Sequence, residues 1–281
     1  LEDGEALRAR GVNFESAWCD VQVGTRTLRR GEDFELVVLG IPVGALPPLT
    51  EELAARSPGW RDMLTHSRTV MTRAMQLWLT PSLAGLGWSA GPTILTTYQY
   101  PWSSWADMSD LVPREAWPPE ASPRTIAYFC DVFPTPPLDD LPLGNPDYPT
   151  QLKQRVKESA LTWLDRHIGH LWPEATTAAN PDGLDYELLL APPAVRGKQR
   201  FDWQYWRINA SPWEQYVQTP PLSVRFRLAP EESGFSNLYL AGDWTRTSIN
   251  GGSFEATVES GMRASRAICG YPRKVAGRFE E

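Results

Sequence analysis

The residues of this chain whose types and spacing most clearly suggest chemistry are Gly242 and Asp243, which directly follow the apolar stretch NLYLA. Such a stretch predicts a buried strand, and a carboxylate at its carboxyl end lies in the crevice where α/β sheets bind ligands. Two consecutive glycines, Gly251 and Gly252, then precede a predicted helix, whose free N–H groups and positive dipole end face the same crevice. A carboxylate binds hydroxyl groups, and a helix N-terminus favours a phosphate or an electron-rich ring. A single cofactor that carries hydroxyl groups as well as a phosphate or an electron-rich ring would fit this pattern. An ordinary glycine-rich connection between a strand and a helix would produce the same pattern.

The whole strand–loop–helix segment, residues 237–268, resembles the C-terminal FAD motif of flavin amine oxidases, protoporphyrinogen oxidases and phytoene-type desaturases. The residues that carry the resemblance are Gly242, Asp243, Asn250, Gly251, Gly252, Glu255, Ala256, Ser260 and Gly261. It implies that Asp243 bonds the ribityl chain of FAD and that backbone N–H groups around Ser253 and Phe254 meet flavin O2 and N1, where reduction places negative charge. Gly261 would let the helix lie close to the sheet. The cofactor-binding residues implied by the resemblance are Gly242, Asp243, Asn250, Gly251, Gly252, Ser253 and Phe254.

A second, weaker resemblance covers residues 34–46, FELVVLGIPVGAL, which are similar to the strand and turn that lead back into the FAD domain in the same superfamily. Residues 197–217 are similar to bacterial proteins known only as FAD- or NAD(P)-binding. Two features depart from the family. The GxGxxG unit that binds the ADP moiety is not found at the start of the chain. Ser253 stands where amine oxidases place an aromatic residue beside the flavin, which weakens the case for an amine substrate.

Other motifs give weaker signals. The string GLGWSA, residues 85–90, fits a wider form of GxGxxG, but Gly91 and Pro92 follow it, so we expect no helix to open there and no pyrophosphate site. His167 and His170 are three residues apart on a predicted helix, a spacing that can share a metal. Because no carboxylate or Cys pattern accompanies them, we expect no metal site. No P-loop occurs, so the NTPase class has no support. The string GWSAG, residues 87–91, has the form GxSxG, but because we expect no helix to open at Gly91 and Pro92, the hydrolase class has no support either.

Polar residues on two predicted strands, 200–206 and 222–228, leave alternatives open. Asp202, Arg225 and Arg227 could reach a substrate cavity or could lie on solvated strand faces. The 13 Trp residues could form an exposed carbohydrate-binding surface, although a buried aromatic core or a cavity for an apolar substrate is the better explanation.

Composition excludes some partners and locations. The net charge of -7 and pI near 5.2 argue against nucleic acid, which requires clustered Lys and Arg. No run of 18 apolar residues occurs, so we expect no transmembrane segment. Three widely spaced cysteines favour a reducing compartment, and we expect a cytoplasmic protein. An acidic run after Leu1 resembles neither a signal peptide nor a native start, and we expect a fragment, a processed chain or a trimmed one.

The elements that must position these residues follow from periodicity and breakers. The predicted strands are 34–39, 69–79, 92–99, 124–132, 200–206, 222–228 and 237–241. One predicted helix starts at Glu51 with Thr50 as its cap, and two others cover 150–171 and 253–268. The apolar run 34–39 predicts a strand buried on both faces. For the last helix, the spacing predicts a packed face of Phe254, Val258, Gly261 or Met262, and Ala264 or Ser265.

Together these patterns predict an α/β fold with an α+β insertion. Residues 1–48 and 232–281 would form an incomplete Rossmann-like FAD-binding domain without its GxGxxG unit, and residues 49–231 a substrate domain with a mixed or antiparallel sheet. The parent protein would be an FAD-dependent oxidoreductase that dehydrogenates an apolar, aromatic or amine small molecule by hydride transfer to flavin. Its catalytic residues are not identifiable. The isolated chain would bind FAD weakly or not at all and be inactive.

Two other interpretations of the chain remain open. It could be one subunit of a split flavoenzyme whose partner carries the missing N-terminal FAD-binding segment. It could also be a non-catalytic, Trp-rich interaction or carbohydrate-binding domain. Exposure of the Trp rings together with sugar binding would favour the second of these.

Overall fold

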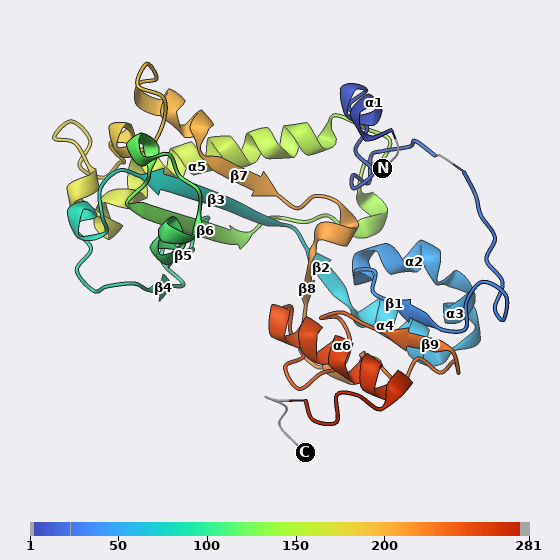
Figure 1. Ribbon diagram of the computed structural model, residues 1–281. Coiled ribbons are helices and arrows are strands. Elements are labelled where there is room, and N and C mark those ends of the chain that lie inside the picture. Colours follow the sequence, from blue (N-terminus) through green and yellow to red (C-terminus); the bar gives the residue numbers. More distant parts are fainter. Residues whose placement is uncertain (1–2, 23, 276–281) are drawn as a thin grey trace. The chain divides into compact units, whose positions relative to one another are not determined.

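The computed structural model describes residues 3–22 and 24–275, which form two compact units (Figure 1). Unit 1 comprises Leu1–Met71, Thr135–Pro146 and Ala210–Glu281; unit 2 comprises Thr72–Pro134 and Asp147–Asn209. The predicted domain boundaries, at 48/49 and 231/232, differ from these divisions, because residues 49–71 and 210–231 pack with unit 1. The assignment of the two parts to FAD and substrate stays a prediction.

Unit 2 is built on a five-stranded antiparallel sheet with the strand order β4-β5-β6-β3-β7. Its strands are β3 (Thr72–Leu79), β4 (Ile94–Leu95), β5 (Ser104–Asp107), β6 (Thr125–Val132) and β7 (Tyr205–Ile208). The longest pairing joins β3 to β6, with Thr72 opposite Val132 and Leu79 opposite Thr125. Side chains of β3 alternate between buried and half-buried, as expected for a strand with one face in the core. The antiparallel sheet predicted for this part of the chain is confirmed.

The helix α5 (Tyr148–Leu171) covers the buried face of this sheet. Its buried residues are Leu152, Val156, Ala160, Trp163, Leu164, Ile168 and Leu171, which is the face that its periodicity predicts. Trp163 packs edge-on against Phe129 of β6, with ring centroids 5.3 Å apart. The helix begins two residues before the predicted cap Thr150, at Tyr148 after the N-cap Asp147, because Pro149 is tolerated in a first turn.

Among the described residues, six tryptophans are the largest side chains that are fully buried. They are Trp60 and Trp244 in unit 1 and Trp102, Trp105, Trp163 and Trp172 in unit 2. Trp105 and Trp172 contact each other and Phe129 edge-on or stacked, so the rings form a continuous aromatic core. Since these rings are closed off from solvent, they cannot stack on a sugar, and the core explanation for them is confirmed.

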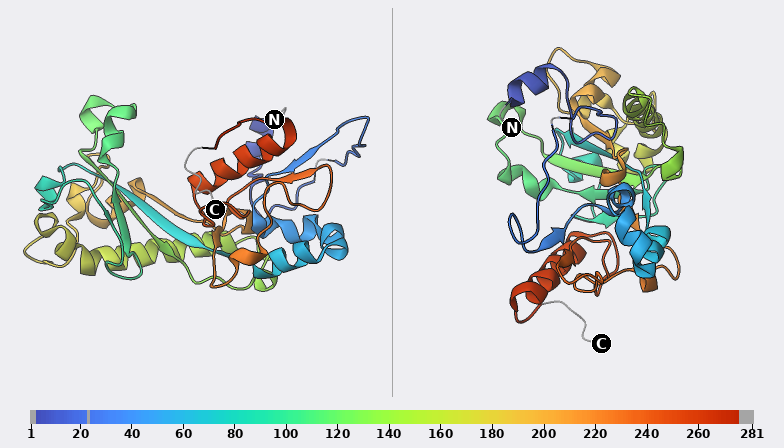
Figure 2. Two further views of the ribbon diagram at one scale, coloured as in Figure 1. Left: turned by 90° about the horizontal axis from the view of Figure 1, so that it is seen from below. Right: turned by 90° about the vertical axis from the view of Figure 1, so that its right-hand side faces the viewer.

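Unit 1 contains two small strand pairs and most of the helices. The strands β1 (Val37–Leu39) and β9 (Leu238–Leu240) pair in parallel, and β2 (Arg68–Val70) pairs antiparallel with β8 (Tyr216–Gln218). The helices are α1 (Gly4–Ala9), α2 (Leu46–Leu49), α3 (Glu51–Arg56), α4 (Pro58–His66) and α6 (Phe254–Cys269). α6 lies beside β9 (Figure 2). Val43, Leu46, Trp60, Met63, Val217, Leu240 and Trp244 form the core of this unit.

Short 3-10 turns connect these elements. They are Val43–Ala45, Ala84–Leu86, Ser109–Arg114, Pro119–Ala121, Leu138–Asp140, Pro173–Ala175, Tyr186–Leu188, Gly197–Trp203, Pro212–Glu214 and Val224–Phe226. Two predicted strands, 200–206 and 222–228, are therefore largely wrong, because Gly197–Trp203 and Val224–Phe226 are 3-10 turns. Within the described ranges, no helix is long and apolar enough to cross a membrane.

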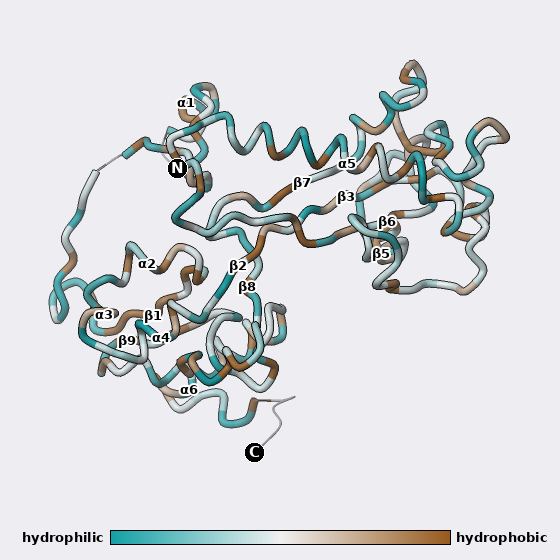
Figure 3. Tube along the Cα trace, turned by 180° about the vertical axis from the view of Figure 1, so that it is seen from behind, coloured by the Kyte–Doolittle hydropathy of each residue, from teal (hydrophilic) through white to brown (hydrophobic). Residues whose placement is uncertain are grey.

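The strand predicted over 34–39 is shorter and more exposed than its apolar run suggests. β1 is confined to three residues, and Val37 and Val38 are 38% and 53% exposed. Figure 3 shows β1 as an apolar segment. The prediction that this strand is buried on both faces is wrong, because Val37 and Val38, whose side chains point to opposite faces, are both exposed.

Candidate functional site

The candidate site begins where β9 ends. The Ala241 N–H donates to the Leu39 carbonyl oxygen at 3.0 Å, which extends the parallel pair by one bond before the Gly-Asp turn. Gly242 has φ 145°, and a Cβ built on it would lie 2.5 Å from Nε1 of the buried Trp244. A side chain at position 242 would therefore collide with a core residue, so only glycine fits this turn.

Asp243 follows at the carboxyl end of β9, as the sequence predicts, and is half-buried. Burial raises the pKa of its carboxyl group, while the positive charge of Arg227 and the N–H groups of Asp243 and Trp244 act in the opposite direction. Burial also lowers the pKa of the Arg227 guanidinium, and the negative charge of Asp243 acts in the opposite direction. The turn thus presents a partly desolvated carboxylate supported by one buried cation.

The loop after the turn is closed by reciprocal polar contacts. The Thr247 N–H donates to Asn250 Oδ1 and the Asn250 N–H donates to Thr247 Oγ1, each at 3.1 Å. Asn250 has φ 53°, a left-handed conformation that Asn adopts more readily than most residues. These contacts give Asn250 a structural role in the loop.

The glycines before α6 allow close packing. A Cβ on Gly252 would lie 2.6 Å from the ring of Tyr216, whose hydroxyl donates to the Gly252 carbonyl oxygen. At Gly251 a Cβ would meet nothing closer than 4.0 Å. Ser253 is the N-cap of α6, and its Oγ accepts the Ala256 N–H at 3.1 Å. The predicted start of this helix is confirmed, and the cap satisfies one of its free N–H groups.

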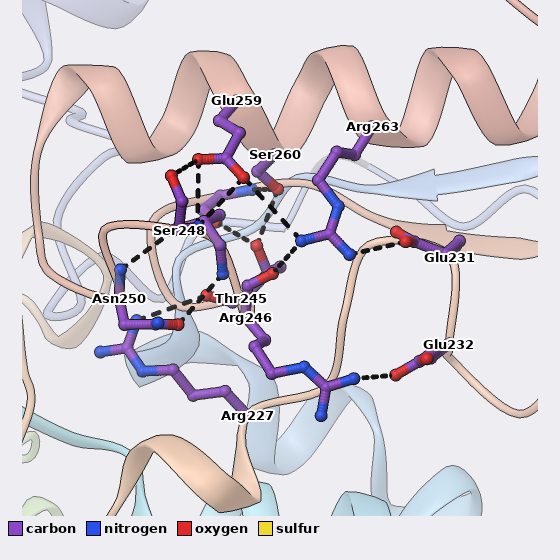
Figure 4. A network of polar contacts seen from close by, with 12 residues as sticks. Arg227, Glu231, Glu232, Thr245, Arg246, Ser248, Asn250, Glu259, Ser260 and Arg263 are labelled. Atoms are coloured by element: carbon purple, nitrogen blue, oxygen red, sulfur yellow. Dashed lines mark hydrogen bonds and ion pairs between the residues drawn. The ribbon is translucent and has the colours of Figure 1, made fainter. Parts of the chain in front are cut away.

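The inner side of α6 is polar. Glu259 accepts the Ser248 N–H at 3.0 and 3.1 Å, and also the Ser248 hydroxyl. Ser260 Oγ accepts the Gly242 N–H at 3.0 Å and the Thr245 hydroxyl at 2.8 Å. This buried network joins the helix to the Gly-Asp turn and to the loop (Figure 4).

A third residue of the inner side extends the network. Arg263 donates to the Arg246 carbonyl oxygen at 2.8 Å and pairs with Glu231 at 2.6 Å. The positive charge of Arg263 lowers the pKa of the Glu231 carboxyl group against the effect of burial. Polar contacts therefore hold α6 along two of its turns.

The outer side of α6 is apolar and exposed. Phe254, Val258 and Met262 are 87%, 51% and 39% exposed, and a Cβ on Gly261 would meet nothing within 4 Å. The packed face predicted from the helical period is therefore wrong, apart from Ala264, which is buried. The implied role of Gly261, close approach to the sheet, does not hold within the described residues.

The structure thus brings the expected residues into one strand–loop–helix segment of unit 1. Gly242 and Asp243 follow β9, Asn250 closes the loop, and Gly252 and Ser253 precede Phe254, the first residue of α6. The sequence does not predict Glu259 and Ser260 as hydrogen-bond partners of the loop and the turn, because each bonds to residues 11 or more positions away along the chain. For Arg227 it predicts either a position in a substrate cavity or one on a solvated strand face, and neither alternative includes a contact with the Gly-Asp turn.

Two other sequence expectations also have outcomes. In the stretch 85–90, the 3-10 turn Ala84–Leu86 ends before its C-cap Gly87, which has φ 89°, and no α-helix opens there, as predicted. His167 and His170 lie on α5. The His167 backbone carbonyl accepts the Tyr98 hydroxyl at 2.6 Å.

Comparison with known proteins gives one match to a family. Residues 188–269 match the family described as Flavin containing amine oxidoreductase. This match confirms the predicted likeness of the C-terminal part of the chain to the flavin amine oxidase superfamily. A search of curated proteins finds no match.

One similar solved structure is the crystal structure of an oxidoreductase from Methanosarcina mazei. The TM-score is 0.47 and the sequence identity is 15%, over 84% of this chain and 44% of that chain. The chain therefore spans less than half the length of this structural relative.

Proposed function

We propose that this chain supplies the flavin-facing part of an FAD-dependent oxidoreductase, with the cofactor at the Gly-Asp turn and the N-terminus of α6. Asp243 would accept hydrogen bonds from ribityl hydroxyls, and the N–H groups from Gly252 to Phe254 would face the flavin pyrimidine edge. The bound cofactor would take a hydride from an apolar, aromatic or amine small molecule. The chain's own residues would hold and orient it.

The observation that carries this proposal is the construction of the Gly-Asp turn. Gly242 is fixed against Trp244, Asp243 remains partly desolvated next to Arg227, and the family match covers these residues. A carboxylate that is only half-buried retains room to bind a hydroxyl group. The N-terminus of α6 adds backbone N–H groups and the positive end of the helix dipole, which favour a negatively charged or electron-rich partner.

The exposed apolar surface of unit 1 supports a further part of the proposal. Phe254, Val258 and Met262 on α6, together with Val37 and Val38 on β1, would be covered by an additional FAD-binding segment that carries the GxGxxG unit. Parallel strands are normally buried on both faces, and the β1–β9 pair is not. The segment would belong to the same polypeptide or to a separate subunit of a split enzyme.

Titration with FAD tests the proposal. We expect weak binding by the chain alone, because the pyrophosphate and adenosine lack their usual anchor. Millimolar FAD should still shift the backbone amide resonances of Gly242, Asp243 and Gly252–Phe254 in nuclear magnetic resonance spectra. Asp243→Ala should reduce affinity by about 10- to 150-fold, the equivalent of a charge-assisted hydrogen bond of about 1.5–3 kcal/mol.

Two variants serve as comparisons in the same titration. Gly252→Val should weaken binding by blocking the approach of backbone to flavin, although Tyr216 must also move to admit the side chain. Asp202→Asn changes a carboxylate in unit 2 and should leave FAD binding unchanged. Shifts confined to residues outside 242–254, or equal losses in Asp243→Ala and Asp202→Asn, would contradict the flavin assignment.

A further inference from the structure

Arg227 is a buried cation that the family resemblance does not assign. It follows the 3-10 turn Val224–Phe226 and is 3% exposed. Its Nη1 donates to the backbone carbonyl oxygens of Asp243 at 2.6 Å and Thr245 at 3.5 Å. Its Nη2 donates to Thr219 Oγ1 at 2.9 Å and to the Gln218 carbonyl oxygen at 3.3 Å. One guanidinium therefore ties the end of β8 to the Gly-Asp turn.

Thr219 extends this connection to the glycine loop. Its hydroxyl accepts from Arg227 and donates to the Asn250 carbonyl oxygen at 2.6 Å. The backbone reinforces the same junction, because the Arg246 N–H donates to the Leu228 carbonyl oxygen at 2.9 Å. The candidate site has two halves, the turn at Asp243 and the loop at Asn250. Arg227 contacts the turn directly and is connected to the loop through the Thr219 hydroxyl.

The other charged groups of this network are engaged elsewhere. Arg246 pairs with Glu232 and Arg263 with Glu231, while the Glu259 carboxylate receives the Ser248 N–H and hydroxyl. Arg227 is the cation whose charge acts on the Asp243 carboxyl group, and that effect opposes the rise in pKa caused by burial.

We infer that Arg227 is a positioning residue of this site, which holds the backbone of the Gly-Asp turn in place and keeps a positive charge beside the Asp243 carboxylate. The use of that carboxylate for flavin rests on the proposed function. The positioning itself is a property of the chain alone. A neutral Asp243 would offer a ribityl hydroxyl a weaker, uncharged acceptor.

A solely structural Arg227 makes a different prediction. If the guanidinium only donated hydrogen bonds to the carbonyl oxygens of the turn, its loss would destabilise unit 1 but leave the titration of Asp243 unchanged. The two cases are separated by measuring the Asp243 carboxyl resonance against pH in the protein without flavin. Amide hydrogen exchange at Gly242–Thr245 reports the rigidity of the turn separately.

Four proteins are compared: the unaltered chain, Arg227→Gln, Arg227→Lys and the control Arg225→Gln. Arg225 is exposed and lies over the ring of Phe226, so its replacement removes a nearby cation without touching the turn. In Arg227→Gln we expect the Asp243 midpoint to rise and exchange at the turn to accelerate about 10-fold or more. Arg227→Lys should keep the midpoint close to that of the unaltered chain, with faster exchange, because a lysine keeps the charge but cannot reach all four acceptors.

An unchanged Asp243 midpoint in a folded Arg227→Gln protein, or an equal rise in Arg225→Gln, would overturn the inference. If Arg227→Gln does not fold, Arg227→Lys decides: a retained midpoint with faster exchange supports the inference, and unchanged exchange overturns it. Adding FAD to the same samples tests the other proposal. A shifted midpoint in Arg227→Gln together with no flavin response in any protein would support the role of Arg227 and count against the flavin site.

Discussion

The two long helices of the chain contrast in what they bury. α5 in unit 2 buries an apolar face that includes Trp163 and Leu164, and its polar residues lie outside. α6 in unit 1 buries Glu259, Ser260 and Arg263, while Phe254 and Val258 are exposed. Both helices have a clear apolar stripe at helical spacing. The comparison teaches that the spacing identifies which residues share a face, whereas the neighbouring elements decide whether that face is covered.

The difference also separates two kinds of stabilisation. The α5 side of unit 2 depends on aromatic packing, with Trp163 between Tyr98 and Phe129. The inner side of α6 depends on buried hydrogen bonds that also shape the candidate site. Substitutions in unit 2 should therefore cost stability alone, and substitutions in unit 1 should change stability and site geometry together.

The largest effect is expected for Trp163→Ala in unit 2. Trp163 is 1% exposed, and its Nε1 donates to the Gln99 carbonyl oxygen at 2.9 Å. Truncation should lower the free energy of unfolding by about 3–5 kcal/mol, measured by urea denaturation. Trp203, which is 55% exposed, provides the matched control: Trp203→Ala should change it by about 0.5 kcal/mol or less. Similar losses for the two variants would refute the aromatic-core description.

A smaller effect is expected for Glu259→Ala in α6. The substitution leaves the Ser248 N–H and hydroxyl without their acceptor and should cost about 1–3 kcal/mol. It should also accelerate amide exchange in the loop 245–250. Glu255→Ala, at an exposed position in the first turn of the same helix, should cost less than about 1 kcal/mol by losing its interaction with the helix dipole. Equal costs would show that the buried network contributes nothing beyond the dipole.

The exposed stripe of α6 should behave in the opposite way. Phe254→Ser, Val258→Ser and Met262→Gln combined should change unfolding free energy by little, because these side chains already contact water. The combined variant should bind less of a dye for apolar surface and elute as a sharper monomer peak in size-exclusion chromatography. Ile94→Ser, which removes a 77% exposed residue of unit 2, is the control. If the control has the same effect as the triple variant, the stripe is not the surface that associates.

Much of unit 2 was predictable because its signals are local or strongly periodic. The β6 strand and the α5 helix were found within two residues, and the buried face of α5 was correct. In unit 1 the sequence predicts the start of α6 directly after Gly251 and Gly252, and its end at Gly270, which has φ 75°. These features depend on caps and breakers whose action does not require distant contacts.

The failures have a physical cause in common. The α6 face at Phe254 was assigned to the core because apolar residues usually are, and the exposed β1 was assigned two covered faces for the same reason. Coverage is a tertiary property that one segment cannot encode. Arg227 and Glu259 were missed as partners of the loop because their bonds join positions 16 and 11 residues apart. Nothing in the local spacing indicates such pairs.

The smallest effect on stability is expected for Asp243→Asn, and it should be a gain where the other variants lose stability. Burial raises the pKa of this carboxyl group above its ordinary value despite Arg227, so the folded chain holds its proton more tightly than the unfolded chain. Near neutral pH, where both states are ionised, the charge therefore costs stability. That cost disappears as the pH falls through the raised folded pKa, since the folded chain takes up its proton first. An asparagine at position 243 carries no charge and so avoids this cost, and its side-chain oxygen can still accept the Trp244 N–H.

We therefore expect Asp243→Asn to raise the melting temperature slightly at pH 7 and to lose this advantage in acid, measured by calorimetry at several pH values. Asp202→Asn in unit 2, which removes the ion pair of Lys157 with Asp202, should give no such gain. The same Asp243→Asn protein should respond less to FAD. A residue that costs stability in the empty chain and is needed for a cofactor is what a binding role predicts, because a site residue is selected for the complex and not for the free fold. If Asp243→Asn instead lowers the melting temperature at neutral pH, the carboxylate is a structural partner of Arg227, and its assignment to a ligand loses that argument.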